Sequence, residues 1–301
     1  MARGSRATLQ YIPEVTFGTT PGTPQMIELP ARNWSSPYTK NGFIIDDRRS
    51  DRQIVDYRFG RSQGALTIEA FYRKTDFDTF LEAVLMGTWT TNVLKAGTTN
   101  RHFSIESGFP DIAEYHVYKG VRLNSFKLGV SLDGPVISTF GGLYREMTRS
   151  GTALDVSPTA ASTNPAFDSF TGSISEGGSP IAIVTGVEIN VDNGMQPQNV
   201  VFDDKAQDFV DGKSTVTGQV TAYFESAALI TKYLGETATS LSFTLTDANA
   251  ASHTFLLPRI FYTAADGFAP QGDGPIVVTL PFQAVRDSTE ASNIKVTRSA
   301  A

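Results

Sequence analysis

The chain carries an internal repeat, because segments of its first half return in the same order in its second half. The sequence DGPVISTF at residues 133–140 returns as DGPIVVTL at residues 273–280. A repeat this long exceeds the roughly 20 to 50 residues of solenoid units, so it predicts a duplicated domain. Duplicated domains suit symmetric assemblies, in which each copy takes an equivalent place.

Further matches extend the repeat over most of the chain. They are NG at 41–42 with 193–194 and GRS at 60–62 with GKS at 212–214, both at an offset of 152; GALTIE at 64–69 with GQVTAY at 218–223, at 154; and His116 with His253 and Arg122 with Arg259, both at 137. The offset falls because residues 87–110 form a longer excursion in the first copy. The constant order of the matches makes a chance origin a poor explanation.

Composition limits the classes of protein to consider. The 301 residues suffice for two ordinary domains, and the absence of cysteine excludes disulfides and thiolate metal sites. A net charge of -6 argues against a general nucleic-acid binder, which needs Lys and Arg to displace counterions from phosphate. The basic start lacks the apolar run of a signal peptide, and no apolar stretch of about 18 residues occurs, so we expect cytosolic synthesis and no membrane partner.

Period-two alternation of apolar and polar residues predicts strands through most of the chain. Asp133-Gly134 and Asp273-Gly274 are expected to supply positive φ angles for tight hairpins, as are the two Asn-Gly pairs. The predicted strands cover residues 65–72, 124–131, 185–192, 215–224, 241–245 and 275–282.

One helix is predicted at an equivalent place in each copy. In the first, Thr75 or Asp76 can cap and Gly87 can terminate; in the second, Ser226 can cap and Gly235 can terminate. The apolar stripes at helical spacing are Phe77, Phe80, Leu81, Val84 and Leu85, and then Leu229, Ile230, Tyr233 and Leu234. The predicted fold class is therefore mainly β, with two tandem β-sandwich or half-barrel domains, each with one packed α-helix.

The domain boundaries follow from shifts in composition. Residues 1–24, rich in Pro and Gly, are interpreted as an extended N-terminal arm outside the core. Residues 25–149 form the first predicted domain and residues 150–165, dense in Ser, Thr, Gly and Ala, the linker. The second domain is predicted to cover residues 166–301, beginning at Phe167 and Phe170.

The motifs that could carry chemistry have simpler explanations. GRSQG at residues 60–64 fits the letter of a serine nucleophile elbow, but an alternating strand follows it where the elbow needs a helix. His102, His116 and His253 lack metal-ligand spacing, and the acidic clusters near Asp46 and Asp203 lack the register of a calcium loop. We therefore predict no catalytic, cofactor-binding or metal-binding residues.

Two apolar triplets lie inside polar, charged loops. The triplets are Phe43, Ile44 and Ile45 in the loop of residues 43–59, and Val200, Val201 and Phe202 in the loop of residues 195–211. Exposed apolar groups of this kind either fold back on their own domain or contact another subunit. The sequence leaves both explanations open.

Several segments, taken in order, resemble the tail tube proteins of long-tailed, siphovirus-type bacteriophages, in particular the group with two tandem tube domains. The resemblance covers nearly the whole chain. It rests on YIPEVTFGTTP at 11–21, the charged segment 46–56, LMGTW at 85–89, LKAG at 94–97, VTG at 216–218, YF at 223–224, SLSFTLTD at 240–247, PRI at 258–260 and IKVTR at 294–298.

The resemblance implies a structural virion protein and not an enzyme. It implies rings that stack into a tube, each ring being a homotrimer with pseudo-sixfold symmetry or else a homohexamer. The partners that it implies are the tape measure, tail terminator and baseplate proteins. Double-stranded DNA would pass through without specific binding, and assembly would take place in the host cytoplasm. The two triplets would make ring-stacking contacts. The strands of residues 64–72 and 218–224 would contribute to the channel wall, with Leu66, Thr67, Ile68, Glu69, Gln219, Val220 and Thr221 as their residues.

Two other functions remain open at this point. A terminator, baseplate hub or decoration protein of a virion tail could be built from the same domain. A secreted carbohydrate-binding β-sandwich is disfavoured by the missing signal peptide and by the presence of only two tryptophans, Trp34 and Trp89.

Overall fold

The protein is mainly β, as the period-two alternation predicted, in a computed structural model that describes residues 1–225, 228–266 and 273–299. The predicted cap Ser226 lies outside the described residues. The elements are β1 (Thr8–Pro13), β2 (Ile27–Glu28), β3 (Asn33–Ser35), β4 (Tyr38–Ile45), β5 (Asp56–Phe71), α1 (Asp78–Leu85), β6 (Val93–Lys95), β7 (Phe103–Phe109), β8 (Glu114–Ser131), β9 (Ile137–Tyr144), β10 (Glu146–Ser150), β11 (Gly172–Glu176), β12 (Ser179–Pro180), β13 (Val184–Asp192), β14 (Gln196–Gln198), β15 (Asp208–Val210), β16 (Thr215–Tyr223), α2 (Ala228–Leu234), β17 (Thr239–Thr246), β18 (Ser252–Tyr262), β19 (Val277–Ala284) and β20 (Lys295–Arg298).

Both halves of the chain pair their strands in the same spatial order, as a duplicated fold requires. The order is β4-β5-β9-β8-β7-β1 in the first half and β13-β16-β19-β18-β17-β11 in the second. Ile68 pairs with Phe140, and Val220, 152 positions after Ile68, pairs with Leu280, 140 positions after Phe140. The sequence match of Gly64 with Gly218 gave an offset of 154 for this strand. The strand register shows that the offset is 152.

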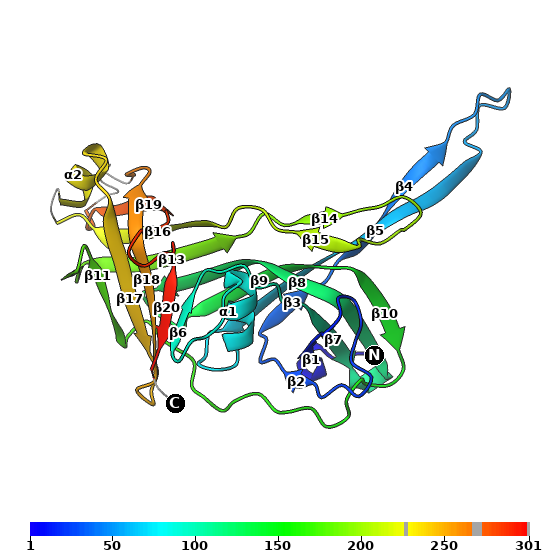
Figure 1. The fold of residues 1–301 in the computed structure, drawn as a ribbon, viewed down its shortest axis with the longest axis horizontal. Helices are drawn as coiled ribbons and strands as arrows, with labels where there is room; N and C mark the ends of the chain where they lie inside the picture. The colour runs from blue at the N-terminus through cyan, green and yellow to red at the C-terminus, as the bar shows by residue number, and fades with distance from the viewer. Residues whose placement is uncertain (226–227, 267–272, 300–301) are drawn as a thin grey trace.

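One sheet runs through both halves, because β8 of the first half pairs with β13 of the second. This pairing joins residues 125–131 to residues 186–192 without a break. The N-terminal part of β8 pairs instead with β7 and β10. In Figure 1, β8 and β13 accordingly lie side by side between the two halves. Alternate residues of these strands are buried in one apolar core to which both halves contribute.

Helix α1 is fully packed, and all five side chains of its predicted stripe are buried. Neither Thr75 nor Asp76 caps it: Phe77 stands at the N-cap position with no side-chain cap. The helix ends at Met86 with φ of 50°, after which Gly87 approaches Lys95 so closely that a Cβ would lie 2.1 Å from its carbonyl oxygen. The backbone of Lys95 therefore leaves no room for a β-carbon at position 87.

Helix α2 packs less completely than predicted. Leu229 and Tyr233 contact the core from partly buried positions, whereas Leu234 is 74% exposed. Part of the apolar stripe predicted for this helix therefore packs on the core, and its C-terminal residue remains exposed.

The N-terminal segment is not an arm outside the core, which corrects that interpretation. Strand β1 pairs with β7 along its whole length, and Leu9 and Tyr11 are buried. The buried carboxylate of Glu14 then accepts hydrogen bonds from the backbone amides of Gly18 (2.7 Å) and Gly120 (2.9 Å). Pairing and these charge-assisted bonds hold the segment on the first half.

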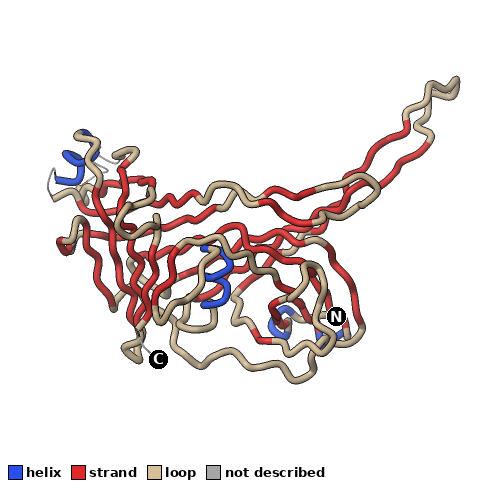
Figure 2. Tube along the Cα trace, in the orientation of Figure 1, coloured by secondary structure: helices blue, strands red, loops and turns tan. Residues whose placement is uncertain are grey.

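The connection between the halves is long and mostly without regular structure, as the tan path of Figure 2 shows. It is nevertheless held in place. Asp155 accepts a hydrogen bond from the backbone amide of Met26 at 3.0 Å, and Phe167 is buried between Tyr72 and His253. The predicted limits of the linker and of the two domains stay a prediction.

The turn predictions hold in part. Gly134 and Gly194 take positive φ angles of 152° and 57°, whereas Gly42 and Gly274 do not. Gly42 stands inside β4, next to an irregularity in its pairing with β5, and the pairing of neighbouring strands there outweighs the turn preference of Asn-Gly.

Candidate functional site

A polar face extends without interruption over six strands drawn from both halves. Its central row consists of side chains that are direct cross-strand neighbours, so they all project from the same face. In spatial order the row is Glu69, Thr139, Lys127, Asn190, Thr217 and Gln283. All six are at least partly exposed, while the residues that flank each of them along the strands mostly point into the core.

The structure divides the side chains of the seven residues named in the predicted channel-wall strands between the two faces of the sheet. Four of them are on the polar face: Thr67, Glu69, Gln219 and Thr221. The other three, Leu66, Ile68 and Val220, are at most 1% exposed and belong to the apolar core. That these strands contribute to a channel wall stays a prediction. The strands were predicted correctly as elements of this sheet, but half of a strand's side chains always point the other way.

Opposite charges are paired on this face. The ammonium group of Lys127 lies 2.8 Å from a carboxylate oxygen of Glu188, which also accepts a hydrogen bond from Asn190 at 3.0 Å. Burial opposes ionisation of Glu188, but the bonds from Lys127 and Asn190 outweigh it and lower its pKa. Arg32 pairs in the same way with Glu69 at 3.1 Å. Each of these cations therefore has a carboxylate partner at neutral pH.

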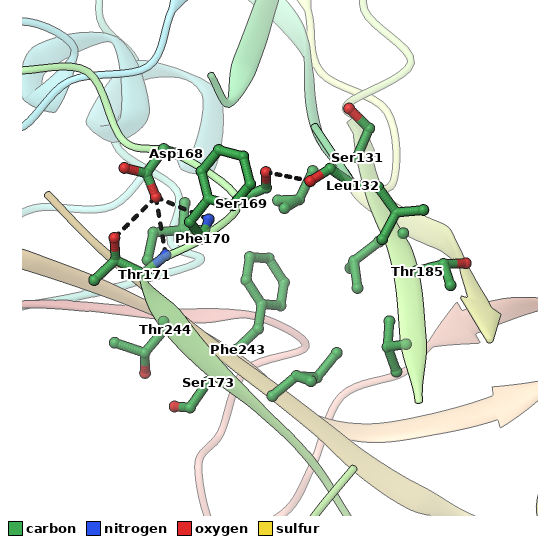
Figure 3. A pocket seen from close by; sticks show the side chains of 17 residues that line it. Ser131, Leu132, Asp168, Ser169, Phe170, Thr171, Ser173, Thr185, Phe243 and Thr244 are labelled. Carbon is green, nitrogen blue, oxygen red and sulfur yellow. Dashed lines mark hydrogen bonds between the residues drawn. The ribbon is translucent and has the colours of Figure 1, made fainter. Parts of the chain in front are cut away.

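A hollow between the two halves offers no comparable chemistry. Figure 3 shows that its polar groups bind one another. Asp168 accepts hydrogen bonds from the backbone amides of Phe170 and Thr171, and the hydroxyl of Ser169 donates to the carbonyl oxygen of Leu132 at 2.8 Å. These side chains close the turn that leads into β11, so the hollow is a structural junction.

Two long hairpins extend from the sheet. We call residues 41–60 the first arm and residues 193–212 the second arm; they are repeat equivalents, 152 positions apart. Figure 1 shows the first arm projecting away from the body at the upper right, while the second arm, which contains β14 and β15, lies above β8 and β9. The second arm meets the base of the first where Ser62 donates a hydrogen bond through its backbone amide to the carbonyl oxygen of Asp204 (2.8 Å).

Both predicted triplets are on these arms and are largely exposed. Phe43 and Ile44 are 53% and 52% exposed in the first arm, and Val201 and Phe202 are 76% and 107% exposed in the second. Ile45 is partly buried and Val200 is 40% exposed. Their role in contacts between subunits stays a prediction.

The second arm is fastened to the first half by a buried cation. The guanidinium of Arg122 is 2% exposed, contacts the carboxylates of Asp208 (3.4 Å) and Asp211 (2.5 Å), and donates to the carbonyl oxygen of Phe209. Beside it, three arm residues, Met195, Ala206 and Phe209, are buried in a small cluster with Met86 of the first half.

A family model described as phage tail tube protein matches residues 4–284, which is nearly the whole chain. The chain belongs to this phage tail tube protein family. Membership identifies it as a structural component of a virion tail and confirms the resemblance inferred from the sequence segments. A comparison with curated proteins gave no match.

The remaining candidate residues of this tail tube protein have structural roles. Ser62 lies in strand β5 and donates to the carbonyl oxygen of Asp204, so the GRSQG motif forms no nucleophile elbow. His116 contacts Glu114, and His253 is buried against Tyr72. Within the described parts of the chain, no three His, Asp or Glu side chains gather as metal ligands, and no helix is long and apolar enough to cross a membrane.

Sequence reasoning missed most of the polar row of the tail tube protein. Thr139, Lys127, Asn190, Thr217 and Gln283 were not among the predicted wall residues. Each has an apolar residue on at least one side in the sequence, so part of the signal was present. What was absent was the pairing of β8 with β13, which brings the strands of both halves into one surface.

Proposed function

We propose that this protein is the major tail tube subunit, which forms stacked rings around the channel through which the phage genome leaves the virion. The observation that carries the proposal is the polar row from Glu69 to Gln283, because it gives both halves of the chain one shared, continuous surface. Such a surface is the wall that a ring of repeated units would present to its channel.

The charges on this face suit the passage of DNA. A duplex carries about one charge per 1.7 Å of its axis, so unpaired Lys and Arg repeated along a tube would hold it by releasing counterions. On the polar face Lys127 is neutralised by Glu188, and the other members of the central row besides Glu69 are uncharged. The duplex therefore meets hydroxyl and amide groups along most of the row.

The repeat suits closure of a ring. Two equivalent units per chain allow three chains to build a ring of six units, through head-to-tail contacts that alternate between the two halves. The proposal includes a tape measure protein inside the growing tube, terminator and baseplate proteins at its ends, assembly in the host cytoplasm, and no catalytic activity.

Electron microscopy of the purified protein tests the proposal. We expect rings or tubes whose cross-section contains three chains; a ring of six chains would keep the function and correct the stoichiometry. A strictly monomeric protein under all assembly conditions would contradict it. Gel densitometry of virions distinguishes a tube subunit from a terminator or hub. We expect hundreds of copies of a tube subunit, because every ring of the stack contains several, and only a few copies of a terminator or hub.

A further inference from the structure

The two arms are repeat equivalents with opposite environments. In the second arm, Met195, Ala206 and Phe209 are 6%, 6% and 3% exposed, because they pack against the first half. The residues 152 positions earlier are Phe43, Ile54 and Tyr57. All three are also apolar or aromatic, yet they are 53%, 64% and 52% exposed. The first arm thus has apolar or aromatic side chains at the equivalent positions, and the described part of its own chain leaves them largely exposed.

We call the contact between the second arm and the first half of the chain the joint. The acidic residue of the joint also has an equivalent in the first arm. Asp208 of the second arm binds Arg122, and its equivalent in the first arm is Asp56, which forms an ion pair with the neighbouring Arg58 at 3.4 Å and accepts a hydrogen bond from the backbone amide of Tyr57 at 2.8 Å. A surface ion pair of this kind contributes little. Asp56 is therefore available for a stronger partner.

The receiving surface of the joint exists in the second half too. Strand pairing places Phe261 at the position of Arg122, since Arg122 pairs with Leu143 and Phe261 with Gln283, 140 positions later. Arg259, two residues earlier and hence on the same face of β18, is exposed and lies over the ring of Phe261 at 5.3 Å. The second half thus presents a cation on the face where the first half binds the second arm.

The ends of the two helices differ in the same way. The C-terminal end of α1 is covered by the second arm, where Asn193 donates a hydrogen bond to the carbonyl oxygen of Val84 at 2.8 Å. The corresponding end of α2 carries Leu234, which is 74% exposed. The second half thus presents an uncovered apolar residue, Leu234, and a surface cation, Arg259, while the first arm offers apolar side chains and an acid.

We propose that the first arm of one chain docks on the second half of another copy of the same chain, and that this contact repeats between chains the joint that the second arm makes within the chain. Asp56 then pairs with Arg259 of the neighbouring copy, and Phe43, Ile54 and Tyr57 become buried against it. The pairing of strand β4 supports this contact. Its equivalent, β13, pairs with a strand on both edges, whereas β4 pairs on one edge only, with β5, among the described residues.

This contact is heterologous, so it propagates head to tail and closes when the rotation allows. It lies within a ring, unlike the ring-stacking role predicted for this loop from the sequence. The inference rests on the proposed function in one respect, the self-assembly of the chain. It goes further because it names the two surfaces in contact, the first arm of one chain and the second half of the next.

Introduced cysteines test the contact directly, because the chain has none of its own. The double variant Asp56→Cys with Arg259→Cys, oxidised after assembly, should give disulfide-linked chains on a non-reducing gel, ending at the number of chains in the ring. A mixture of the two single variants should give linked dimers only. The control pair Thr23→Cys with Arg259→Cys, whose first position lies outside both arms, should stay unlinked.

Charge reversal provides an independent readout. Asp56→Arg or Arg259→Glu alone brings like charges together, and we expect each to raise the protein concentration needed for assembly about tenfold or more. The double reversal should restore assembly. Both positions are exposed in the single chain, so thermal unfolding of the unassembled variants should match the wild type and exclude misfolding.

The outcomes separate this inference from the proposed function. Tubes that form normally in both single reversals, together with no cross-link in the Asp56 and Arg259 cysteine pair, would overturn the inference and leave the tube function standing. A wild-type protein that never assembles and gives no cross-link would overturn both.

Discussion

The hydroxyl of Tyr72 and Nδ1 of His253 lie 2.7 Å apart in a hydrogen bond that joins the first half of the chain to the second. Both side chains are buried, and the other ring nitrogen of His253, Nε2, has no hydrogen-bond partner among the residues that the structure describes. Burial lowers the pKa of His253 to about 3, with the positive charges of Arg298 and Lys74 adding to the effect. His253 is therefore neutral in the folded protein at all ordinary pH values.

The first prediction concerns stability in acid. The unfolded chain takes up a proton at His253 below a pH of about 6.5, whereas the folded protein does not until about pH 3. Stability is therefore lost as the pH falls from about 6.5 towards 3, at up to about 1.4 kcal/mol per pH unit. Urea unfolding of the unassembled chain at pH 7 and pH 4.5 measures this, and His253→Asn, which retains a polar atom for Tyr72, should reduce the difference.

Asp78 provides the control for that measurement, because it acts in the opposite direction. Burial raises its pKa to about 6 although Arg298 binds it, so the folded protein gains a proton there before the unfolded chain does. The contribution of Asp78 to stability therefore becomes more favourable as the pH falls from about 6 towards the pKa that this carboxyl group has in the unfolded chain. Asp78→Asn should therefore steepen the loss of stability in acid, and a flatter response in that variant would contradict the assignment.

A second prediction compares Arg122, which binds the second arm, with Arg259, the exposed cation on the same face of the second half. Arg122→Gln removes a buried cation from two carboxylates and a carbonyl group, and we expect a loss of about 2 kcal/mol, below the value for a fully buried pair because Asp208 is half exposed. Arg259→Gln changes an exposed residue and should stay within about 0.5 kcal/mol. Chemical denaturation of the unassembled chain measures both, and equal effects would contradict the described joint.

A third prediction concerns the charge of the polar face. Thr139→Lys with Thr217→Lys adds two cations to the central row, one in each half. Assembled tubes of this variant should retain labelled duplex DNA at low salt and release it as the salt concentration rises, whereas wild-type tubes should not. Thr23→Lys adds a cation away from this face and is the control; equal retention by that variant would show that the face is not the channel wall.

A fourth prediction tests the close packing of the sheet. A Cβ at Gly218 would lie 2.1 Å from the carbonyl oxygen of Glu188, whereas a Cβ at Gly129 would meet no atom within 4 Å. Gly218→Ala should therefore cost about 1 to 3 kcal/mol, and Gly129→Ala close to nothing. Thermal unfolding distinguishes the two, and tolerance of Gly218→Ala would mean that β13 and β16 separate easily.

Local pattern was enough to predict the repeat, both helices and six of the strands, which correspond to β5, β8, β13, β16, β17 and β19. Alternation around Ile68 and Val220 predicted strands because it reports which residues face a core. The same pattern could not say which neighbour supplies that core. Residues 8–13 were taken for an arm because the Pro and Gly that follow outweighed a short alternating run, although Leu9 and Tyr11 are buried.

The difference between the arms was beyond any local pattern. Tyr57 and Phe209 are aromatic residues at equivalent positions, and only the packing of the whole chain leaves the first exposed and buries the second. The polar row escaped prediction for the same reason. Its members come from strands that are neighbours only because β8 pairs with β13.

The pairing of β8 with β13 also has a consequence for the concentration at which the protein can assemble. The two halves are tethered by one chain, so this joint forms at the high effective concentration of an intramolecular contact and survives any dilution of the protein. In the proposed ring of six units, every second joint is of this kind. Only the alternate joints depend on encounters between molecules, and tuning those alone would set when tubes begin to grow.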